Sequence, residues 1–157
     1  MKVLAIDPGY DRLGVAVLTG TGSAPVLVHS SCILTERNTT LPDRLHAAGA
    51  EVAALLEAHA PDVLAIETLY FNANATTAIA VAEARGIAIY LARTAGCEVR
   101  EFGPQEVKVA VTGYGKSDKR AVIDMVKRLC AGAPERGHDD EYDAIAVGIT
   151  ALAHHRA

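Results

Sequence analysis

Two short apolar segments constrain the fold of this chain most. Val3–Ile6 and Val63–Ile66 contain no polar residue, and each is followed directly by an acid, Asp7 and Glu67. A strand without polar alternation is typical of one buried on both faces, so both segments are predicted to be central strands of a sheet. Functional groups in open α/β sheets gather at the carboxyl edge of such strands. The two acids are therefore expected at one edge.

The remaining pattern predicts a single α/β domain over residues 1–157. Further strands are expected at residues 13–18, 26–34 and 98–102, with a hairpin turn over Gly20–Pro25 between the first two. Helices are expected at about residues 41–60, 74–94 and 139–154, with one opened by Pro104 and another capped by Ser117. This order predicts a mixed five-stranded sheet with helices on both faces.

Composition excludes several classes of protein. Half of the residues are hydrophobic and 22% are charged, which favours a packed core over disorder. The net charge of −4 argues against a polycation that coats nucleic acid. The longest uncharged apolar stretch, Ala144–Ala153, is shorter than the roughly 20 residues of a membrane span, and the N-terminus lacks a signal-peptide core. Three widely spaced cysteines favour neither a disulfide framework nor a zinc site, so a cytoplasmic protein is expected.

Four carboxylates are candidate metal ligands. Asp140 and Asp143 are three residues apart, which places both on one face of the last helix. If they meet Asp7 and Glu67, four anionic groups would repel unless cations lie among them, and carboxylate oxygens suit Mg²⁺ or Mn²⁺. Two such ions can clamp the attacking and leaving oxygens of a phosphodiester. Singly, the acids also fit a turn, a strand end and a helix N-terminus.

A basic segment could hold a phosphate backbone beside these acids. Residues 105–128 carry a net charge of +3 and leave −7 for the rest of the chain. The cations are Lys108, Lys116, Lys119, Arg120, Lys127 and Arg128. They could equally be ordinary solvated helix faces.

Two adjacent aromatic residues follow the second acid. Tyr70 and Phe71 come shortly after Glu67, and aromatic rings can stack on unpaired bases or wedge into a DNA junction. One of the rings could instead pack under its own loop. His138 could tune a metal site or position water, and its role is left open.

The motifs together resemble the RuvC family of bacterial Holliday junction resolvases over nearly the whole chain. The matching stretches are Ile6-Asp7-Pro8-Gly9 with Gly14, Ala65-Ile66-Glu67 with Asn74-Ala75, the Gln105–Val126 pattern Gln-x-Val-Lys-x-x-Val-x-Gly-x-Gly-x-x-x-Lys-x-x-Val-x-x-Met-Val, and Asp140-x-x-Asp143-Ala144-Ile145-Ala146. The third pattern is the most specific, and the order and spacing of all four leave little room for coincidence.

This resemblance implies an RNase H-like fold and a homodimer that makes paired nicks in four-way junction DNA during recombination and repair. It implies two Mg²⁺ or Mn²⁺ ions per site, products with 5′-phosphate ends, and a branch-migration motor complex as partner. Asp7, Glu67, Asp140 and Asp143 match the family's catalytic acids, with Asp7 expected to bridge both ions. Lys108 and Lys119 match its basic residues near the scissile DNA, and Tyr70 matches a ring inserted at the junction. Lys116 and Arg120 are further candidate DNA contacts.

Two other functions remain open from the sequence. A non-catalytic module could recognise branched DNA with the same surface, although the complete set of acids argues against it. An ATP-binding lobe could use Asp7-Pro8-Gly9 as a phosphate loop, but actin-like proteins need two lobes and this chain supplies one. The alanine-rich helix that begins near Asn74 could form the dimer interface or could belong only to the core.

Overall fold

One mixed five-stranded sheet organises the molecule. The computed structural model describes residues 1–9, 11–69 and 75–155. The strands are β1 (Lys2–Asp7), β2 (Arg12–Thr21), β3 (Ala24–Leu34), β4 (Val63–Glu67) and β5 (Glu98–Phe102). Their order in the sheet is β3-β2-β1-β4-β5, with β1 antiparallel to β2 and parallel to β4. The two apolar strands β1 and β4 are interior, as their patterns predict.

The β2–β3 hairpin is longer than predicted. Pairing continues to Gly20↔Pro25 and Thr21↔Ala24, so the turn contains only Gly22 and Ser23. The prediction of a turn over Gly20–Pro25 was wrong because it ended each strand at its last apolar residue. Backbone pairing in a hairpin needs no apolar side chain, and it extends into polar residues until the chain reverses.

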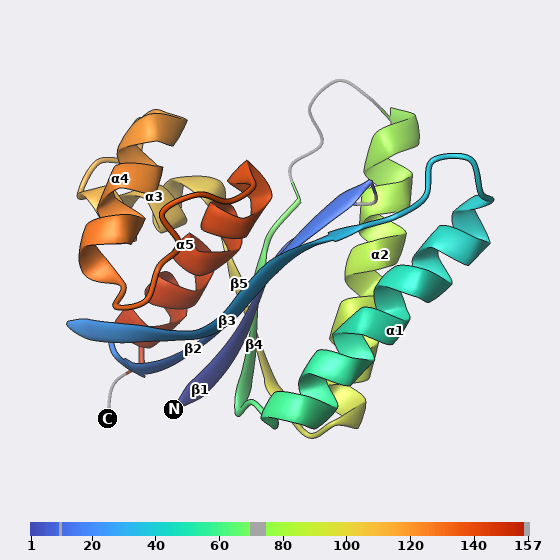
Figure 1. The fold of residues 1–157 in the computed structure, drawn as a ribbon, viewed down its shortest axis with the longest axis horizontal. Helices are drawn as coiled ribbons and strands as arrows, with labels where there is room; N and C mark the ends of the chain where they lie inside the picture. The colour runs from blue at the N-terminus through green and yellow to red at the C-terminus, as the bar shows by residue number, and fades with distance from the viewer. Residues whose placement is uncertain (10, 70–74, 156–157) are drawn as a thin grey trace.

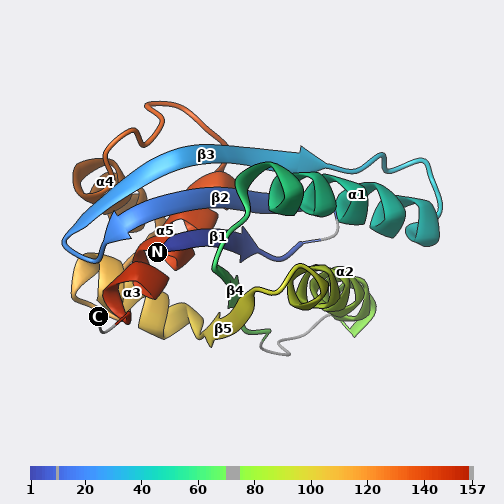
Figure 2. The same ribbon diagram turned by 90° about the horizontal axis from the view of Figure 1, so that it is seen from below.

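Helices cover both faces of the sheet, as expected (Figures 1 and 2). On one face lie α1 (Leu41–His59) and α2 (Ala75–Thr94), and on the other lie α3 (Pro104–Thr112), α4 (Lys119–Leu129) and α5 (Asp139–Ala153). Successive side chains along each strand point to opposite faces of the sheet, and so toward the two helix layers in turn. Leu4 packs with the α1 and α2 side, whereas Val3 packs with α5.

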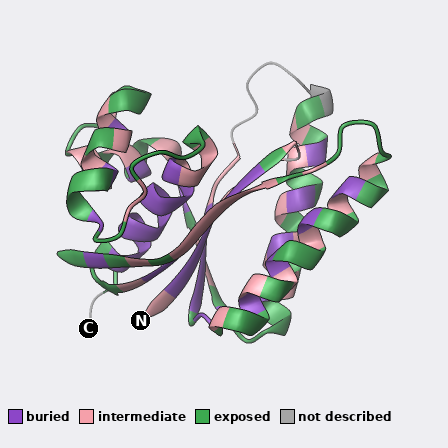
Figure 3. Ribbon diagram, viewed as in Figure 1, coloured by how far each residue is buried: buried purple, intermediate pink, exposed green. Residues whose placement is uncertain are grey.

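The deepest helix is α5, which packs across β2 and β1. From Tyr142 to Leu152 every residue of α5 is buried except Asp143, as Figure 3 shows for the helix as a whole. A helix that is apolar on all sides requires such a buried position. The polar residues at its beginning are therefore held next to the sheet edge.

Local signals mark where α3 and α4 begin and where α3 ends. Pro104 opens α3, and Gly113, with φ 78°, ends it in the left-handed conformation that glycine favours. The cap of α4 is Asp118, whose Oδ1 accepts from the Ala121 amide at 2.8 Å. The prediction of Ser117 as the cap was wrong because the Ser117 hydroxyl is bonded within the preceding loop.

Other features of the described residues follow composition. All three cysteines are free, and Cys97 and Cys130 are buried. Among residues 1–9, 11–69 and 75–155, no helix combines the length and hydropathy that a membrane crossing requires.

Candidate active site

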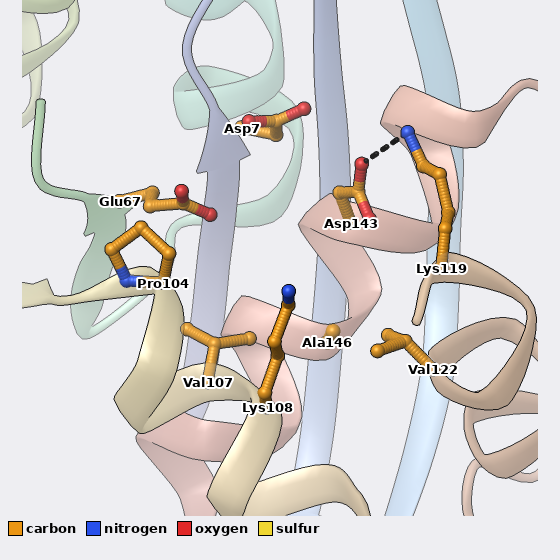
Figure 4. Close-up of a pocket in the computed structure, with 9 residues that line it drawn as sticks. All are labelled: Asp7, Glu67, Pro104, Val107, Lys108, Lys119, Val122, Asp143 and Ala146. Carbon is orange, nitrogen blue, oxygen red and sulfur yellow. Dashed lines mark ion pairs between the residues drawn. The ribbon is translucent and has the colours of Figure 1, made fainter. Parts of the chain in front are cut away.

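The acids at the ends of β1 and β4 share one edge of the sheet. The two strands are parallel neighbours with Ile6 opposite Ile66, so Asp7 and Glu67 follow at the same level. Asp143, from the first turns of α5, faces them across a pocket of about 270 Å³ (Figure 4). The pocket is lined by Asp7, Glu67, Pro104, Val107, Lys108, Lys119, Val122, Asp143 and Ala146.

A close approach between β2 and α5 brings the first turn of the helix to this edge. Gly14 pairs with Asp7 across the β1–β2 ladder. A Cβ atom on Gly14 would lie 1.9 Å from the Asp140 main-chain oxygen, so only glycine allows this packing. The position of Asp140 therefore depends on a residue of the hairpin.

Burial and mutual repulsion favour protonation of the pocket acids. Burial, followed by the charges of Asp143, Glu67 and Asp140, raises the pKa of Asp7 to about 8. Burial and the charge of Asp143 raise the pKa of Glu67 to about 7, against the opposing effect of Lys108 and Lys119. Burial also raises the pKa of Asp143. The pocket thus holds more anionic groups than its cations compensate.

Lys119 and Lys108 supply positive charge within the same pocket. The Lys119 Nζ lies 3.0 Å from Asp143 Oδ2 and 3.5 Å from Asp139 Oδ2. Partial burial lowers the pKa of Lys119, but the bond to Asp143 and the two acidic charges outweigh it and raise that pKa. Figure 4 shows the Lys108 ammonium directed toward the space between Glu67 and Asp143.

Asp140 lies close to the pocket without lining it. Its Oδ2 lies 3.3 Å from the Nε of Arg12, and its charge contributes to the raised pKa of Asp7. Within the described residues, this Oδ2 is the buried side-chain polar atom that has no hydrogen-bond partner. Arg12 was missed in the sequence, because nothing distinguishes it there from an ordinary cation at the exposed start of a strand.

A second residue missed by sequence reasoning supports Glu67. Arg85 of α2 donates from its Nε to the Glu67 main-chain oxygen at 3.2 Å and forms an ion pair with Glu101 of β5. The side chain of Arg85 is largely buried. It therefore fastens α2 to the strand end that carries Glu67.

The donor set fits a hard divalent cation. The acids that face the pocket offer only carboxylate oxygens, the ligands that Mg²⁺ and Mn²⁺ prefer. The raised pKa values of Asp7 and Glu67, and the Asp140 oxygen that accepts no hydrogen bond, indicate carboxylates that a cation would stabilise. In the described part of the chain, no three acid, histidine or cysteine side chains are already gathered as a metal-ligand set. Asp143 and Asp140 instead form ion pairs with Lys119 and Arg12.

The other candidate residues lie elsewhere. Lys116 precedes α4 and Arg120 lies in its first turn, and both are exposed and outside the pocket lining. Tyr70 and Phe71 lie outside the described residues. His138 is the N-cap of α5 and makes no side-chain capping bond, while its carbonyl oxygen accepts from the Glu141 amide.

Comparison with known proteins points to one family. The family model for crossover junction endodeoxyribonuclease RuvC matches residues 3–151. The RuvC protein of Rubrobacter xylanophilus is 40% identical over 98% of this chain and 86% of its own length. The RuvC protein of Brevibacillus brevis is 39% identical over 96% of this chain and 90% of its own length.

Solved structures give the same result. RuvC of Thermus thermophilus in complex with a Holliday junction substrate superposes with a TM-score of 0.90 at 29% identity, over 97% of this chain and 93% of that chain. The yeast mitochondrial Holliday junction resolvase superposes with a TM-score of 0.67 at 14% identity, over 94% of this chain and 78% of that chain, which shows a shared fold.

Proposed function

This chain belongs to the RuvC family of crossover junction endodeoxyribonucleases, and we propose that it resolves Holliday junctions by paired, metal-dependent nicking of DNA during recombination and repair. The observation that carries the proposal is the pocket in which Asp7, Glu67 and Asp143 meet two lysines. Carboxylates alone could serve many purposes. Carboxylates beside cations suit a site that must hold both metal and phosphate.

We assign the metal to the four acids. The charges of the other three acids all raise the pKa of Asp7, so Asp7 would hold metal together with each of them. Glu67, Asp140 and Asp143 would complete the coordination, with Asp140 reaching the pocket by side-chain rotation. When bound, two Mg²⁺ or Mn²⁺ ions would lower the pKa of an attacking water and neutralise charge on the phosphodiester.

The lysines would act on the phosphate. Lys119 is half-exposed and already lies within the pocket, so it can exchange Asp143 for a phosphate oxygen and stabilise the charge that develops there. Lys108 approaches from α3 and would support the same group. In-line attack of water that breaks the bond between phosphorus and O3′ would leave 5′-phosphate and 3′-hydroxyl ends, as the family resemblance implies.

DNA contacts beyond the scissile phosphate are assigned from charge and sequence. Exposed Lys116 and Arg120 lie around the start of α4, which also presents Lys119, and would contact the backbone. Tyr70 or Phe71 would stack on a base at the junction, as expected from the sequence.

A homodimer is proposed because a four-way junction with two-fold symmetry needs two symmetric cuts. The outward face of α2 is a suitable interface, since Ile79 and Tyr90 are 59% and 70% exposed there and small residues lie between them. A branch-migration motor complex is the further proposed partner, and the cytoplasm, where bacterial DNA lies, the proposed location.

The proposal is tested with a mobile four-way junction and a linear duplex of the same sequence. We expect symmetric nicks in the junction, with Mg²⁺ or Mn²⁺ tested separately, and an intact duplex. Junction binding without nicking under either metal would instead identify a non-catalytic binding module. Equal nicking of both substrates would exclude junction specificity.

A further inference from the structure

Arg12 is the one cation that contacts a proposed metal ligand from the hairpin side of the site, among the described residues. It begins β2, whereas Lys119 approaches from α4. Its Nε lies 3.3 Å from Asp140 Oδ2, and no hydrogen bond satisfies that oxygen in the described structure. The carboxylate of Asp140 is thus held by charge alone, beside the pocket rather than in its lining.

Asp140 would have to move to reach the pocket, and the main chain around it cannot provide this movement. Gly14 leaves no room for even a Cβ against the Asp140 carbonyl, so the first turn of α5 rests directly on β2. The adjacent Glu141 accepts from the Ser30 hydroxyl of β3 at 2.5 Å, which ties the same turn to the sheet. Asp140 can therefore change its position relative to the pocket only through its side-chain torsions.

We propose that Arg12 is a positioning residue that holds the Asp140 carboxylate apart from the pocket, and that divalent cation binding must displace this ion pair. The Arg12 side chain is 52% exposed and that of Asp140 is 23% exposed. The guanidinium is half-exposed, and the contact lacks hydrogen-bond geometry although the Asp140 oxygen is buried, so the guanidinium can leave into solvent when a stronger partner arrives. A divalent ion among the neighbouring acids competes for the same oxygen and also repels the guanidinium.

The expected consequence is that Arg12 weakens metal binding. Removal of the guanidinium frees Asp140 and removes one positive charge, and both effects favour a cation. Damage to the fold would have the opposite effect, because a disordered site binds metal less tightly. Tighter binding in a variant is therefore a result that a purely structural role for Arg12 cannot produce.

The test is a Mn²⁺ titration of the intact protein without DNA, followed by calorimetry or by the loss of the free-ion paramagnetic resonance signal. The proteins are wild type, Arg12→Gln, Arg12→Lys, Asp140→Asn and the double variant R12Q/D140N. We expect Arg12→Gln to bind Mn²⁺ about three- to tenfold more tightly than wild type. The double variant R12Q/D140N should bind Mn²⁺ within about twofold of Asp140→Asn alone. Arg12→Lys, which keeps the charge, should fall between wild type and Arg12→Gln.

Arg37→Gln is the matched control. The side chain of Arg37 is 78% exposed and pairs with Asp11, the residue before Arg12 in the chain. Arg37→Gln therefore removes one positive charge from the same region. It should leave Mn²⁺ affinity within about twofold of wild type, because it frees no carboxylate of the site. Thermal unfolding of each variant verifies that all are folded.

The inference rests on the proposed metal site, and the outcomes separate the two. Wild type that binds no Mn²⁺ would overturn the proposed function and this inference with it. Wild type that binds Mn²⁺ with the same affinity as Arg12→Gln would overturn the inference alone. An equal gain in the presence of Asp140→Asn would show a general charge effect and reject the pairing. Weaker junction binding by Arg12→Gln at unchanged Mn²⁺ affinity would make Arg12 a phosphate contact instead.

Discussion

Asp7 ends β1 among three other carboxylates, and its environment explains why an acid at this position suits metal chemistry. Burial and the neighbouring charges raise its pKa to about 8, so in the metal-free protein it is protonated for much of the time near neutral pH. A divalent ion reverses that preference, because it stabilises the ionised carboxylate. The neighbouring charges that disfavour the ionised form of Asp7 in the metal-free protein thus favour the binding of a cation.

Replacement of Asp7 by Asn should abolish nicking and leave junction binding nearly unchanged. The change removes a proposed ligand and one negative charge while it keeps the side-chain shape, and a loss of about a thousandfold or more in cleavage rate is expected. Gel assays of nicking and of binding on the same junction measure both. Asp124→Asn, an exposed acid on α4, is the control and should cleave normally. Metal-dependent nicking by Asp7→Asn would exclude the role assigned to Asp7.

Replacement of Lys119 by Ala should lower the cleavage rate by about a hundredfold, because a phosphate in the pocket would lose one of the two lysines that line it. Junction binding should also depend less steeply on salt, by about one unit of slope. Single-turnover rates and binding at several salt concentrations are the measurements. Arg128→Ala removes an exposed cation from the other end of α4 and serves as the comparison. A rate equal to wild type would remove Lys119 from the site.

The helix that sets the geometry of the site is α5, which packs against strands β1 and β2. Two glycines allow this contact: Gly14 of β2 beneath Asp140, and Gly148 of α5, where a Cβ would lie 2.3 Å from Leu18 Cδ1. A Cβ on Gly14 would meet main chain, whereas a Cβ on Gly148 would meet the end of a flexible side chain. Substitutions at both glycines should weaken the α5 contact, but only the substitution at Gly14 should also move the acids.

Gly14→Ala should reduce both stability and cleavage. The new methyl group has to displace the first turn of α5, for which we expect a loss of about 2–4 kcal/mol in the free energy of unfolding. Gly148→Ala should destabilise as well, but Leu18 can adjust and the acids remain in place. Urea unfolding gives the stabilities, and nicking rates are compared where both variants are fully folded. Equal loss of cleavage in both variants would show that the Gly14 contact has no special role.

For the molecule as a whole, the crowded acids couple stability to pH and metal. Asp7 and Glu67 have pKa values in the folded protein above those of ordinary carboxyl groups, so the folded state binds protons more tightly than the unfolded state. Their contribution to stability is fully present below about pH 4 and is lost as pH rises toward about 8. The stabilisation by an added divalent cation should grow over the same range.

Thermal unfolding with and without Mg²⁺ or Mn²⁺ tests this coupling. The increase in Tm on metal addition should be larger at pH 8.5 than at pH 6, because fewer protons compete for the carboxylates. Without metal at pH 8.5, Asp7→Asn should be more stable than wild type, by on the order of 1–2 kcal/mol, since it removes one buried negative charge. Metal stabilisation that is independent of pH would contradict the assignment of these acids.

Much of the architecture could be predicted because its signals are local. The unbroken apolar runs before Asp7 and Glu67 identified two interior strands, and the spacing of Asp140 and Asp143 placed them on one helix. Local backbone competition was harder to predict: Asp118 rather than Ser117 caps α4, and the β2–β3 hairpin continues into polar residues. The first error arises because neighbouring residues offer nearly equal local bonds, and the second because backbone pairing does not depend on apolar side chains.

The sequence by itself determined the elements, the interior strands and the residues that carry charge, because burial patterns and turn residues act over a few positions. Only the tertiary structure decided how those charges are paired. Arg12 meets Asp140, and Arg85 meets the carbonyl of Glu67, across segments that are distant in the chain. Such pairs depend on how closely a helix approaches a strand, here through Gly14, and that distance is a property of the packed molecule rather than of any local stretch.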